Sequence, residues 1–267
     1  MKKSQSVKKF RKRWRQKRKI QIVKNRFFWA FGLFLIAFLI IFYLVCFYCL
    51  FQIKEIQVKG NQKVKMENIK NLVELYLPQK IIFWDSRSIF LANLERLDEE
   101  ILNYFPQIGE VSIQRQFPDK LIISVQERKP IGVVKKDNNY FFIDKEGVVF
   151  EKVNNQRNQW PEIIPPETDK DLKIGRTIIQ KGLGSLIAEI EEELGKKEIS
   201  LCSIKIVSSK RANVLTQEGW EIYFNLDDDI SKQVFNLDLV LREKISPQER
   251  KNLEYIDLRF GNQIFYK

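Results

Sequence analysis

The chain has 267 residues, with 46 Lys and Arg, 34 Asp and Glu, three Cys and no His. Without His, the commonest general base, the Ser-His-Asp triad and most zinc sites are excluded. The net charge of +12 arises in residues 1–26, which carry 13 basic and no acidic residues, so the remainder is nearly neutral. A folded nucleic-acid-binding domain would need a basic patch of its own, and none is indicated.

An uncharged run follows the basic segment and extends from Phe27 to Phe51. Its 25 residues are enough, at ~1.5 Å per helical residue, to cross the ~30 Å hydrocarbon core of a bilayer. The run is longer than the roughly 7 to 15 apolar residues of a signal peptide. We therefore predict a basic cytoplasmic tail over 1–26, a retained transmembrane helix over 27–51 and an extracytoplasmic remainder.

Cysteine placement limits how the exported part can be stabilised. Cys46 and Cys49 lie within the apolar run, three residues apart, and are interpreted as small apolar residues on one helix face. Cys202 is the only thiol beyond the run, so no internal disulfide can form there. A hydrophobic core must stabilise this part of the chain.

The next 80 residues predict a strand, two helices and two strands. The strand covers residues 51–60 and ends at a Gly60-Asn61 turn, and the first helix ends at Pro78. The second helix begins with Asp85-Ser86 as cap candidates and carries Phe90 to Phe105 on one stripe until Pro106. Two strands at 111–117 and 121–125 then flank a turn. This order is typical of a small α+β domain.

The rest of the chain predicts a β-rich region with helices. Its expected elements are an extended segment from Trp160 to Pro166, a helix at 179–194, strands at 199–207, 212–216 and 220–226, a helix at 230–244 and, after a Gly261-Asn262 turn, a short strand at 263–266. Three acidic residues precede the second helix. We interpret them as favourable to the helix dipole rather than as a metal site, because the calcium-loop spacing is absent.

Several strings in the expected order carry a resemblance to a known family. Residues 111–121, followed by Glu127-Arg128-Lys129-Pro130, resemble the POTRA domain of the FtsQ/DivIB family of bacterial cell-division proteins. Residues 53–61, 140–150 and 255–262 resemble that family's opening strand, second-domain hairpin and terminal hairpin. The residues that match the POTRA pattern are Gly60, Asn61, Arg115, Phe117, Pro118, Glu127, Arg128 and Pro130. Gln107 stands where the family often has Trp.

The resemblance implies an architecture and a function. The architecture is α+β: a transmembrane helix, a POTRA domain over 52–129 and a C-terminal β-rich domain with flanking helices over 130–267. The function is that of a non-catalytic divisome scaffold at the septum, in the cytoplasmic membrane of a bacterium. Such a scaffold binds the single-pass coiled-coil proteins FtsB (DivIC) and FtsL, and through them the septal peptidoglycan synthase. No cofactor and no metal are expected.

The final strand is the predicted binding site. A last strand is often an edge strand, which can accept a partner strand by β-augmentation. The residues assigned to partner binding are Arg259, Phe260, Gly261, Asn262, Gln263, Ile264, Phe265 and Tyr266. Deletion of residues 263–267 is expected to abolish binding and leave the POTRA domain folded.

Other interpretations stay open at this point. The last strand could simply complete its sheet, and the whole protein could be a membrane-anchored POTRA-type envelope chaperone or assembly factor. A cell-wall enzyme is disfavoured because no constellation of side chains specifies a reaction.

Overall fold

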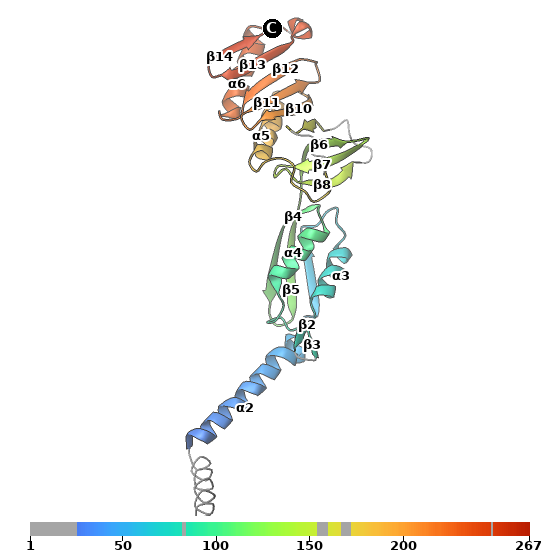
Figure 1. Ribbon diagram of the computed structural model, residues 1–267, viewed down its shortest axis with the longest axis vertical. Helices are drawn as coiled ribbons and strands as arrows, with labels where there is room; N and C mark the ends of the chain where they lie inside the picture. Colours follow the sequence, from blue (N-terminus) through green and yellow to red (C-terminus); the bar gives the residue numbers. More distant parts are fainter. Residues whose placement is uncertain (1–25, 82–83, 154–159, 167–171, 247) are drawn as a thin grey trace, which may run out of the picture. The chain divides into compact units, whose positions relative to one another are not determined.

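The computed structural model describes residues 26–81, 84–153, 160–166, 172–246 and 248–267. All of the predicted basic tail except Arg26 lies outside the described residues. The chain forms two compact units, shown with their elements in Figure 1. The first contains the described part of residues 1–59 with 67–97 and 113–123, and the second contains 60–66, 98–112 and 124–267. The α+β class predicted from the sequence is confirmed.

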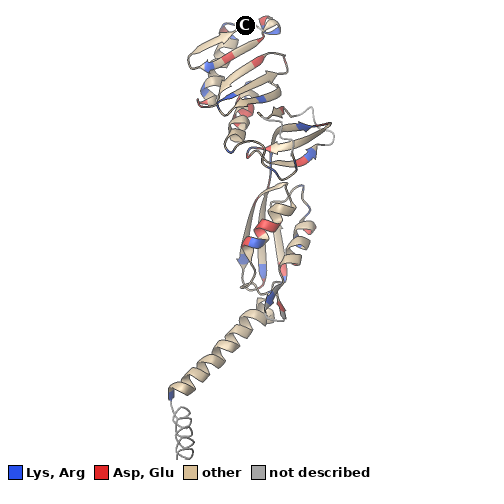
Figure 2. Ribbon diagram, in the orientation of Figure 1, with Lys and Arg blue, Asp and Glu red and all other residues tan. Residues whose placement is uncertain are grey.

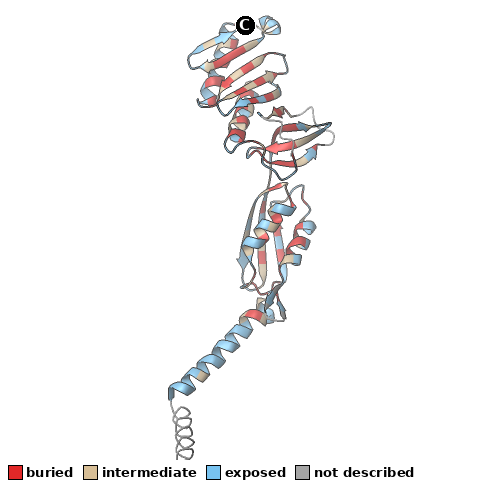
Figure 3. Ribbon diagram, in the orientation of Figure 1, coloured by how far each residue is buried: buried red, intermediate tan, exposed pale blue. Residues whose placement is uncertain are grey.

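The helix α2 (Arg26–Phe47) is the only helix among the described residues that is long and apolar enough to cross a membrane. Only 6% of its apolar window is buried, which distinguishes it from the core helix of a soluble domain; Figure 3 colours it almost entirely as exposed. The helix ends earlier than predicted, and η1 (Cys49–Phe51) follows as a 3-10 turn. Cys46 is buried and Cys49 is exposed, so the expected shared helix face is wrong.

The POTRA-like region contains a three-stranded sheet in the order β1-β5-β4. Its strands are β1 (Glu55–Lys59), β4 (Ile108–Gln116) and β5 (Lys120–Glu127), and its helices are α3 (Met66–Tyr76) and α4 (Leu94–Tyr104). Both helices are amphipathic: Ile69 and Val73 are fully buried on α3, and Ile101 is fully buried on α4. Alternate residues of β5 are buried, as the two-residue period predicts. The predicted strand-helix-helix-strand-strand order is confirmed for these five elements.

One hairpin in this region was not predicted. The strands β2 (Gln79–Ile81) and β3 (Trp84–Ser86) pair antiparallel between α3 and α4. The helix α4 therefore begins at Leu94, and Asn93 is its cap, since its Oδ1 accepts a hydrogen bond of 3.1 Å from the backbone N–H of Arg96. The expected cap at Asp85-Ser86 is wrong because Ser86 is buried in the hairpin strand.

The second sheet has nine strands in the order β14-β13-β12-β11-β10-β9-β6-β7-β8. They are β6 (Pro130–Lys136), β7 (Asn139–Asp144), β8 (Val149–Val153), β9 (Glu162–Ile164), β10 (Leu201–Ser208), β11 (Arg211–Thr216), β12 (Glu221–Asn225), β13 (Tyr255–Phe260) and β14 (Gln263–Tyr266). The expected extended segment contains β9, which pairs in parallel with β6 on one side and β10 on the other. It is a central strand, and it joins the two halves of the sheet.

Two helices share the core of this second sheet. They are α5 (Leu183–Gly195) and α6 (Ile230–Glu243), and η3 (Glu249–Asn252) precedes β13. Asp229 caps α6, because its carboxylate accepts a hydrogen bond of 2.8 Å from the backbone N–H of Lys232. This confirms the helix-start interpretation of the acidic residues there. The buried side chains of the strands pack with those of both helices; the largest fully buried ones include Trp220, Phe224 and Ile163.

Candidate partner-binding edge

The final hairpin lies where the sequence predicts it. Its last antiparallel pair is Phe260 with Gln263, so Gly261 and Asn262 form a two-residue loop. Gly261 has a φ of +64°, and a positive φ at the first central position is the feature of a type II′ turn. No atom lies within 4 Å of where a Cβ would be built on Gly261. The requirement for glycine is therefore conformational and not a matter of space.

The strand β14 lies at one end of the nine-stranded order. The backbone N–H of Lys267 donates to Tyr255 O at 3.2 Å, and the backbone N–H of Tyr255 donates to Lys267 O at 3.4 Å. Since successive residues of a strand point their backbone groups to opposite sides, Phe265 faces β13 while Ile264 and Tyr266 face outward. In the described part of the chain no strand pairs with that outer side. The edge therefore presents two N–H and two C=O groups.

Large apolar side chains lie along this open edge. Phe260, Phe265 and Tyr266 are 55%, 50% and 49% exposed, and β14 is drawn mostly as exposed in Figure 3. The rings of Phe260 and Phe265 meet edge to face, with their centroids 5.4 Å apart. Ile264 instead packs against the core between the sheet and its helices. The exposed rings leave apolar surface beside free backbone groups, which is a combination suited to a partner strand.

An ion pair lies within β13, next to the edge strand. The carboxylate of Asp257 accepts two hydrogen bonds from the guanidinium of Arg259, one from Nε at 2.8 Å and one from Nη2 at 2.5 Å. Both residues lie where β13 carries one extra residue relative to β14, between the pairs of Asp257 and Phe260. Burial acts to raise the pKa of Asp257, but the hydrogen bonds and charge of Arg259 outweigh it and hold that pKa below its usual value. Asp257 is therefore ionised at neutral pH.

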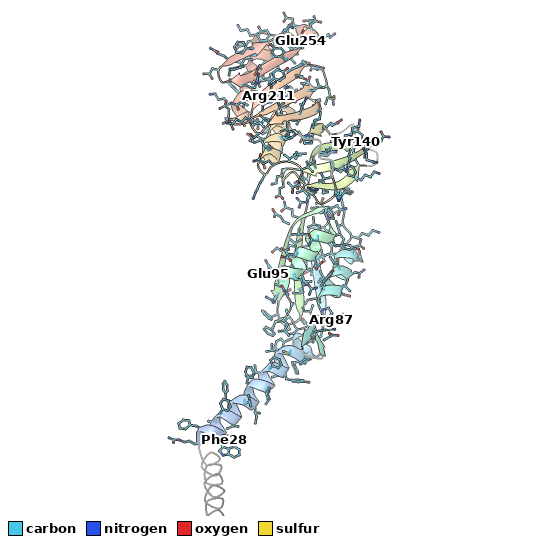
Figure 4. All side chains as sticks on the ribbon, in the orientation of Figure 1. Phe28, Arg87, Glu95, Tyr140, Arg211 and Glu254 are labelled. Atoms are coloured by element: carbon cyan, nitrogen blue, oxygen red, sulfur yellow. The ribbon has the colours of Figure 1, made fainter. Side chains whose placement is uncertain are left out.

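An aromatic and cationic group lies beside this ion pair. The rings of Tyr223 and Tyr255 stack with centroids 5.3 Å apart, across the parallel pairing of β12 and β13. The guanidinium groups of Arg211 and Arg259 lie 5.0 and 5.5 Å from the Tyr223 centroid; Figure 4 labels Arg211. Cation–π contacts of this kind stabilise exposed sites by about 0.5–1 kcal/mol each. They stiffen the sheet near its open end.

A second exposed apolar pair lies on α6 and was missed in the sequence. Phe235 and Leu239 are 62% and 45% exposed, and they stand four residues apart on one helix face. Asn236 reaches the turn of the final hairpin, where its Nδ2 lies 3.5 Å from Gly261 O. The signal was present in the sequence as two apolar residues outside the core stripe of α6.

The POTRA-pattern residues fall into three separate groups, of which the first closes a loop. Glu127 Oε1 accepts hydrogen bonds from the backbone N–H groups of Gln62, Lys63 and Val64 at 2.7, 2.8 and 2.9 Å. Gly60, with a φ of +85°, comes so close to β5 that a Cβ would lie 2.2 Å from Val125 O. Asn61 Nδ2 donates to Val64 O at 3.0 Å. Burial acts to raise the pKa of Glu127, but the backbone hydrogen bonds to its carboxylate outweigh that effect and lower the pKa below its usual value.

The second group surrounds Arg128. Its Nε donates to Pro106 O at 3.1 Å, and its guanidinium binds the carboxylates of Asp144 and Glu146. Its backbone N–H donates to Gln107 O at 2.8 Å, so the residue at the expected Trp position contributes a carbonyl. Pro130 begins β6 opposite Asp144.

The third group comprises Arg115, Phe117 and Pro118. Arg115 donates from Nε to Ile89 O at 2.7 Å and from a terminal nitrogen to Ala92 O at 2.8 Å. Phe117 is 57% exposed, and a cis peptide bond links it to Pro118. These three groups support loops and strands, and none of them converges on the edge at β14. Among the described residues no three acidic or Cys side chains lie close enough to hold a metal ion.

A β-α-α-β-β domain and a β-rich domain with an open terminal edge, preceded by one helix able to span a membrane, define a POTRA-containing protein. Comparison with protein-family models gives the family. Residues 51–128 match the model "POTRA domain, FtsQ-type", and residues 132–259 match "Cell division protein FtsQ/DivIB, C-terminal". Together the two consecutive matches cover most of the chain. The chain belongs to the FtsQ/DivIB family of cell division proteins.

Individual relatives agree with this assignment along most of their lengths. A cell division protein DivIB of Clostridium tetani is 25% identical over 244 residues, which cover 88% of this chain and 86% of the relative. A DivIB of Clostridium acetobutylicum is 27% identical over 224 residues, which cover 80% of this chain and 82% of the relative. A cell division protein FtsQ of Syntrophotalea carbinolica is 26% identical over 232 residues, which cover 81% of this chain and 74% of the relative. The family match of the C-terminal domain ends at Arg259, immediately before the turn and β14.

Proposed function

We propose that this protein is a non-catalytic scaffold of the bacterial divisome that binds its partners through the outer edge of β14. The partners are single-pass coiled-coil proteins of the FtsB (DivIC) and FtsL type, and through them the septal peptidoglycan synthase. The helix α2 anchors the chain in the cytoplasmic membrane, with the N-terminus in the cytoplasm and the domains at 52–129 and 130–267 outside, at the septum. The open edge of β14 is the observation that supports this proposal.

The mechanism is addition of a strand. Ile264 and Tyr266 offer two donors and two acceptors on the outer side of β14, as derived above from the Lys267–Tyr255 pairing. Each backbone hydrogen bond contributes about 0.5–1.5 kcal/mol net, so four of them supply affinity but no sequence preference. The exposed rings of Phe260, Phe265 and Tyr266 then select the partner by the side chains they accept. Association of this kind requires no cofactor.

A pair of substitutions at Tyr266 separates the backbone from the side chain. Tyr266→Pro removes an N–H that faces outward and makes no bond to β13, and proline is tolerated in that position of an edge strand. Tyr266→Ala removes the ring and keeps the N–H. We expect the proline variant of the full-length protein to bind an FtsB-like partner roughly two- to ten-fold more weakly than the alanine variant. Titration of the purified proteins by fluorescence anisotropy measures the difference.

The control is the stability of each variant, read from its thermal midpoint, which should match for the two substitutions. Equal affinity of the proline and alanine variants would rule out strand addition at this edge. Deletion of residues 263–267 removes every outward group at once, and we expect binding to fall below detection. Retention of binding by that truncated chain would refute the assignment of the site altogether.

A further inference from the structure

The C-terminal end of α2 is bound by side chains from the β2–β3 hairpin and the loop after it. The last carbonyl groups of a helix have no partner within the helix. Here the Ser88 hydroxyl donates to Val45 O at 2.5 Å, and the Ser86 hydroxyl donates to Cys46 O. Both serines are 1% exposed. These hydrogen bonds from buried serines connect the C-terminal end of α2 to the β2–β3 hairpin and the loop after it.

Gln52 makes the connection on the other side of this joint. Its Nε2 donates to Cys46 O at 3.0 Å, and its Oε1 accepts from the backbone N–H of Arg87 at 2.8 Å. The backbone of the same segment is paired too, because Ile53 donates to Arg87 O at 3.0 Å and Ile89 donates to Phe51 O at 2.9 Å. Figure 4 labels Arg87 at this position. With this many bonds, the segment after α2 is a fixed joint and not a flexible tether.

An apolar ridge extends from the joint. We define the aromatic ridge as Tyr48, Leu50, Phe51, Phe90 and Phe117. The ring centroids of Phe51 and Phe90 lie 5.1 Å apart, and those of Phe90 and Phe117 lie 5.3 Å apart. Tyr48 and Leu50 are each 48% exposed, Phe90 is 43% and Phe117 is 57%. Contiguous exposed apolar side chains of this size mark an interaction surface.

The ridge is held in place by the Arg115 group described above. The Arg115 guanidinium binds Ile89 O and Ala92 O, one on each side of the segment that carries Phe90. Phe117 follows two residues after Arg115 at the end of the same strand region. The segment that carries Phe90 is therefore held by partly buried hydrogen bonds from Arg115 to its backbone.

The length of α2 determines what covers the ridge. Its 22 residues span about 33 Å at ~1.5 Å per residue, against a hydrocarbon core of ~30 Å. Its end thus lies at the boundary with the headgroup layer, which adds roughly 5–8 Å on each side. Tyr48 and Phe51 follow directly after the helix, and the rings of Phe90 and Phe117 continue from Phe51 at spacings of about 5 Å. The ridge therefore begins at the depth where aromatic side chains of membrane proteins gather.

The charges next to the ridge are consistent with this location. Lys54 is the first charged residue after the helix, and its Nζ lies 3.6 Å from a carboxylate oxygen of Asp119. Lys120 Nζ pairs with Glu55 at 2.6 Å. Figure 2 shows α2 without charged residues beyond its start and blue and red residues reappearing after its end. Paired charges at the boundary oppose a close approach to lipid less than unpaired ones do.

From this geometry we propose that the aromatic ridge is seated in the headgroup layer of the bilayer at the C-terminal end of α2. The occupant is lipid, because a bilayer is the one surface that α2 itself brings to the ridge. The consequence is that the first unit lies on the membrane in a set orientation. The inference rests on α2 spanning the membrane and is independent of the partner-binding edge.

Spin labels on the full-length chain test this proposal. In a background with Cys46, Cys49 and Cys202 replaced by Ala, single cysteines are introduced as Phe117→Cys and, for a matched control, Leu75→Cys. Leu75 is an apolar residue on α3 in the same unit and is 71% exposed. Each labelled chain, alone in nanodiscs of phosphatidylethanolamine and phosphatidylglycerol, is measured for label collisions with oxygen and with a water-soluble nickel chelate.

We expect the ratio of oxygen to nickel accessibility at position 117 to exceed that at position 75 several-fold. Phe90→Cys provides a second reading on the ridge and should agree with position 117, so that one perturbed label cannot decide the result. Equal ratios at positions 117, 90 and 75 would overturn the proposal. Shielding of the ridge that appears only after a partner protein is added would also overturn it, because the occupant would then be that partner.

Discussion

The two ends of the nine-stranded sheet are treated differently by the rest of the chain. At one end, the outer side of β8 is covered at its first residue: the backbone N–H of Val149 donates to Arg176 O at 2.9 Å and that of Gly175 donates to Val149 O at 2.7 Å. Val148 and Thr177 form a further antiparallel bridge. At the other end, β14 has no such cover in the described residues. One sheet thus has one edge whose start is covered and one open edge.

This difference matters because an open edge is a liability. A row of free N–H and C=O groups invites pairing with any available strand, and proteins usually cover, shorten or charge such edges. Residues 175–178 cover the start of β8, whereas β14 is free in the described residues, with exposed rings beside it. An open edge that is otherwise easy to close is best explained by a partner that closes it. The contrast between β8 and β14 is therefore the main support for the proposed binding mode.

The largest expected effect comes from removing the cover of β8. Gly175→Pro deletes the N–H that binds Val149 O, and it places proline at a φ of +88°, which its ring cannot adopt. We expect the free energy of unfolding to fall by about 3–4 kcal/mol, and the freed edge to promote self-association. Urea denaturation and size-exclusion chromatography measure the two effects.

The matched control for that variant is Gly175→Ala. It places an L-residue at a positive φ, which alanine can adopt at a cost, and it retains the N–H. It should lose about 1–2 kcal/mol and remain monomeric. If the proline variant is no less stable than the alanine variant, the hydrogen bond to Val149 does not protect this edge, and the contrast with β14 is lost.

A smaller loss of unfolding free energy is expected from removing the ion pair on β13, next to the open edge. Asp257→Asn removes the charge that holds Arg259, and we expect a loss of about 2 kcal/mol at neutral pH. The folded-state pKa of Asp257 lies below its usual value, so this contribution is present above about pH 4 and is lost as the pH falls through the folded-state pKa. The gap in unfolding free energy between the two proteins should therefore narrow in acid. Urea denaturation at neutral pH and near pH 3 tests this.

Asp227→Asn is the control for charge removal at an exposed site. Asp227 pairs with Lys210 at 2.8 Å, but both side chains are more than half exposed, so the change should be within about 0.5 kcal/mol. Asp257→Asn and Asp227→Asn with equal stabilities would show that the Arg259 pair contributes nothing to the edge.

The smallest expected effect concerns a carboxyl group on α5, outside the two edge strands. Burial raises the pKa of Glu191, on α5, to about 7. The folded state then holds a proton that the unfolded state lacks between its usual pKa and about pH 7, so stability falls as the pH rises through that range. Glu191→Gln should be more stable than the parent by about 1 kcal/mol near pH 8, after allowance for solvent screening, and nearly equal near pH 4. A constant difference at both pH values would contradict the raised pKa.

Periodicity predicted the long elements well, because burial on one face leaves a regular pattern. The alternation of β5 and the apolar stripe of α6 are of this kind, and the Gly261-Asn262 turn is set by local backbone geometry. The failures depend on distant contacts. The central position of β9 cannot be read from its own segment, because it pairs with strands that are distant in the sequence. The β2–β3 hairpin is local, but its strands of three residues each are too short to show an alternating pattern.

The candidate site was predictable in part for the same reason. A terminal two-residue hairpin indicates a last strand, and the sequence placed residues 259–266 there. The start of β8 is covered by residues that follow it by more than twenty positions, and no local pattern encodes this difference from β14. The role of Ser86 differed from the predicted helix cap because its hydroxyl binds Cys46 O, on a helix that ends 39 residues earlier.

In-cell photocrosslinking at both ends of the sheet tests whether the partner binds at β14. A photoreactive residue is placed at Gln263 on β14 in one strain and at Lys152 on β8 in another; both side chains are exposed. After irradiation, captured proteins are identified by mass spectrometry. We expect position 263 to capture a small single-pass coiled-coil protein and position 152 not to capture it. Capture of that protein at position 152 alone, or at neither position, would contradict binding at the open edge.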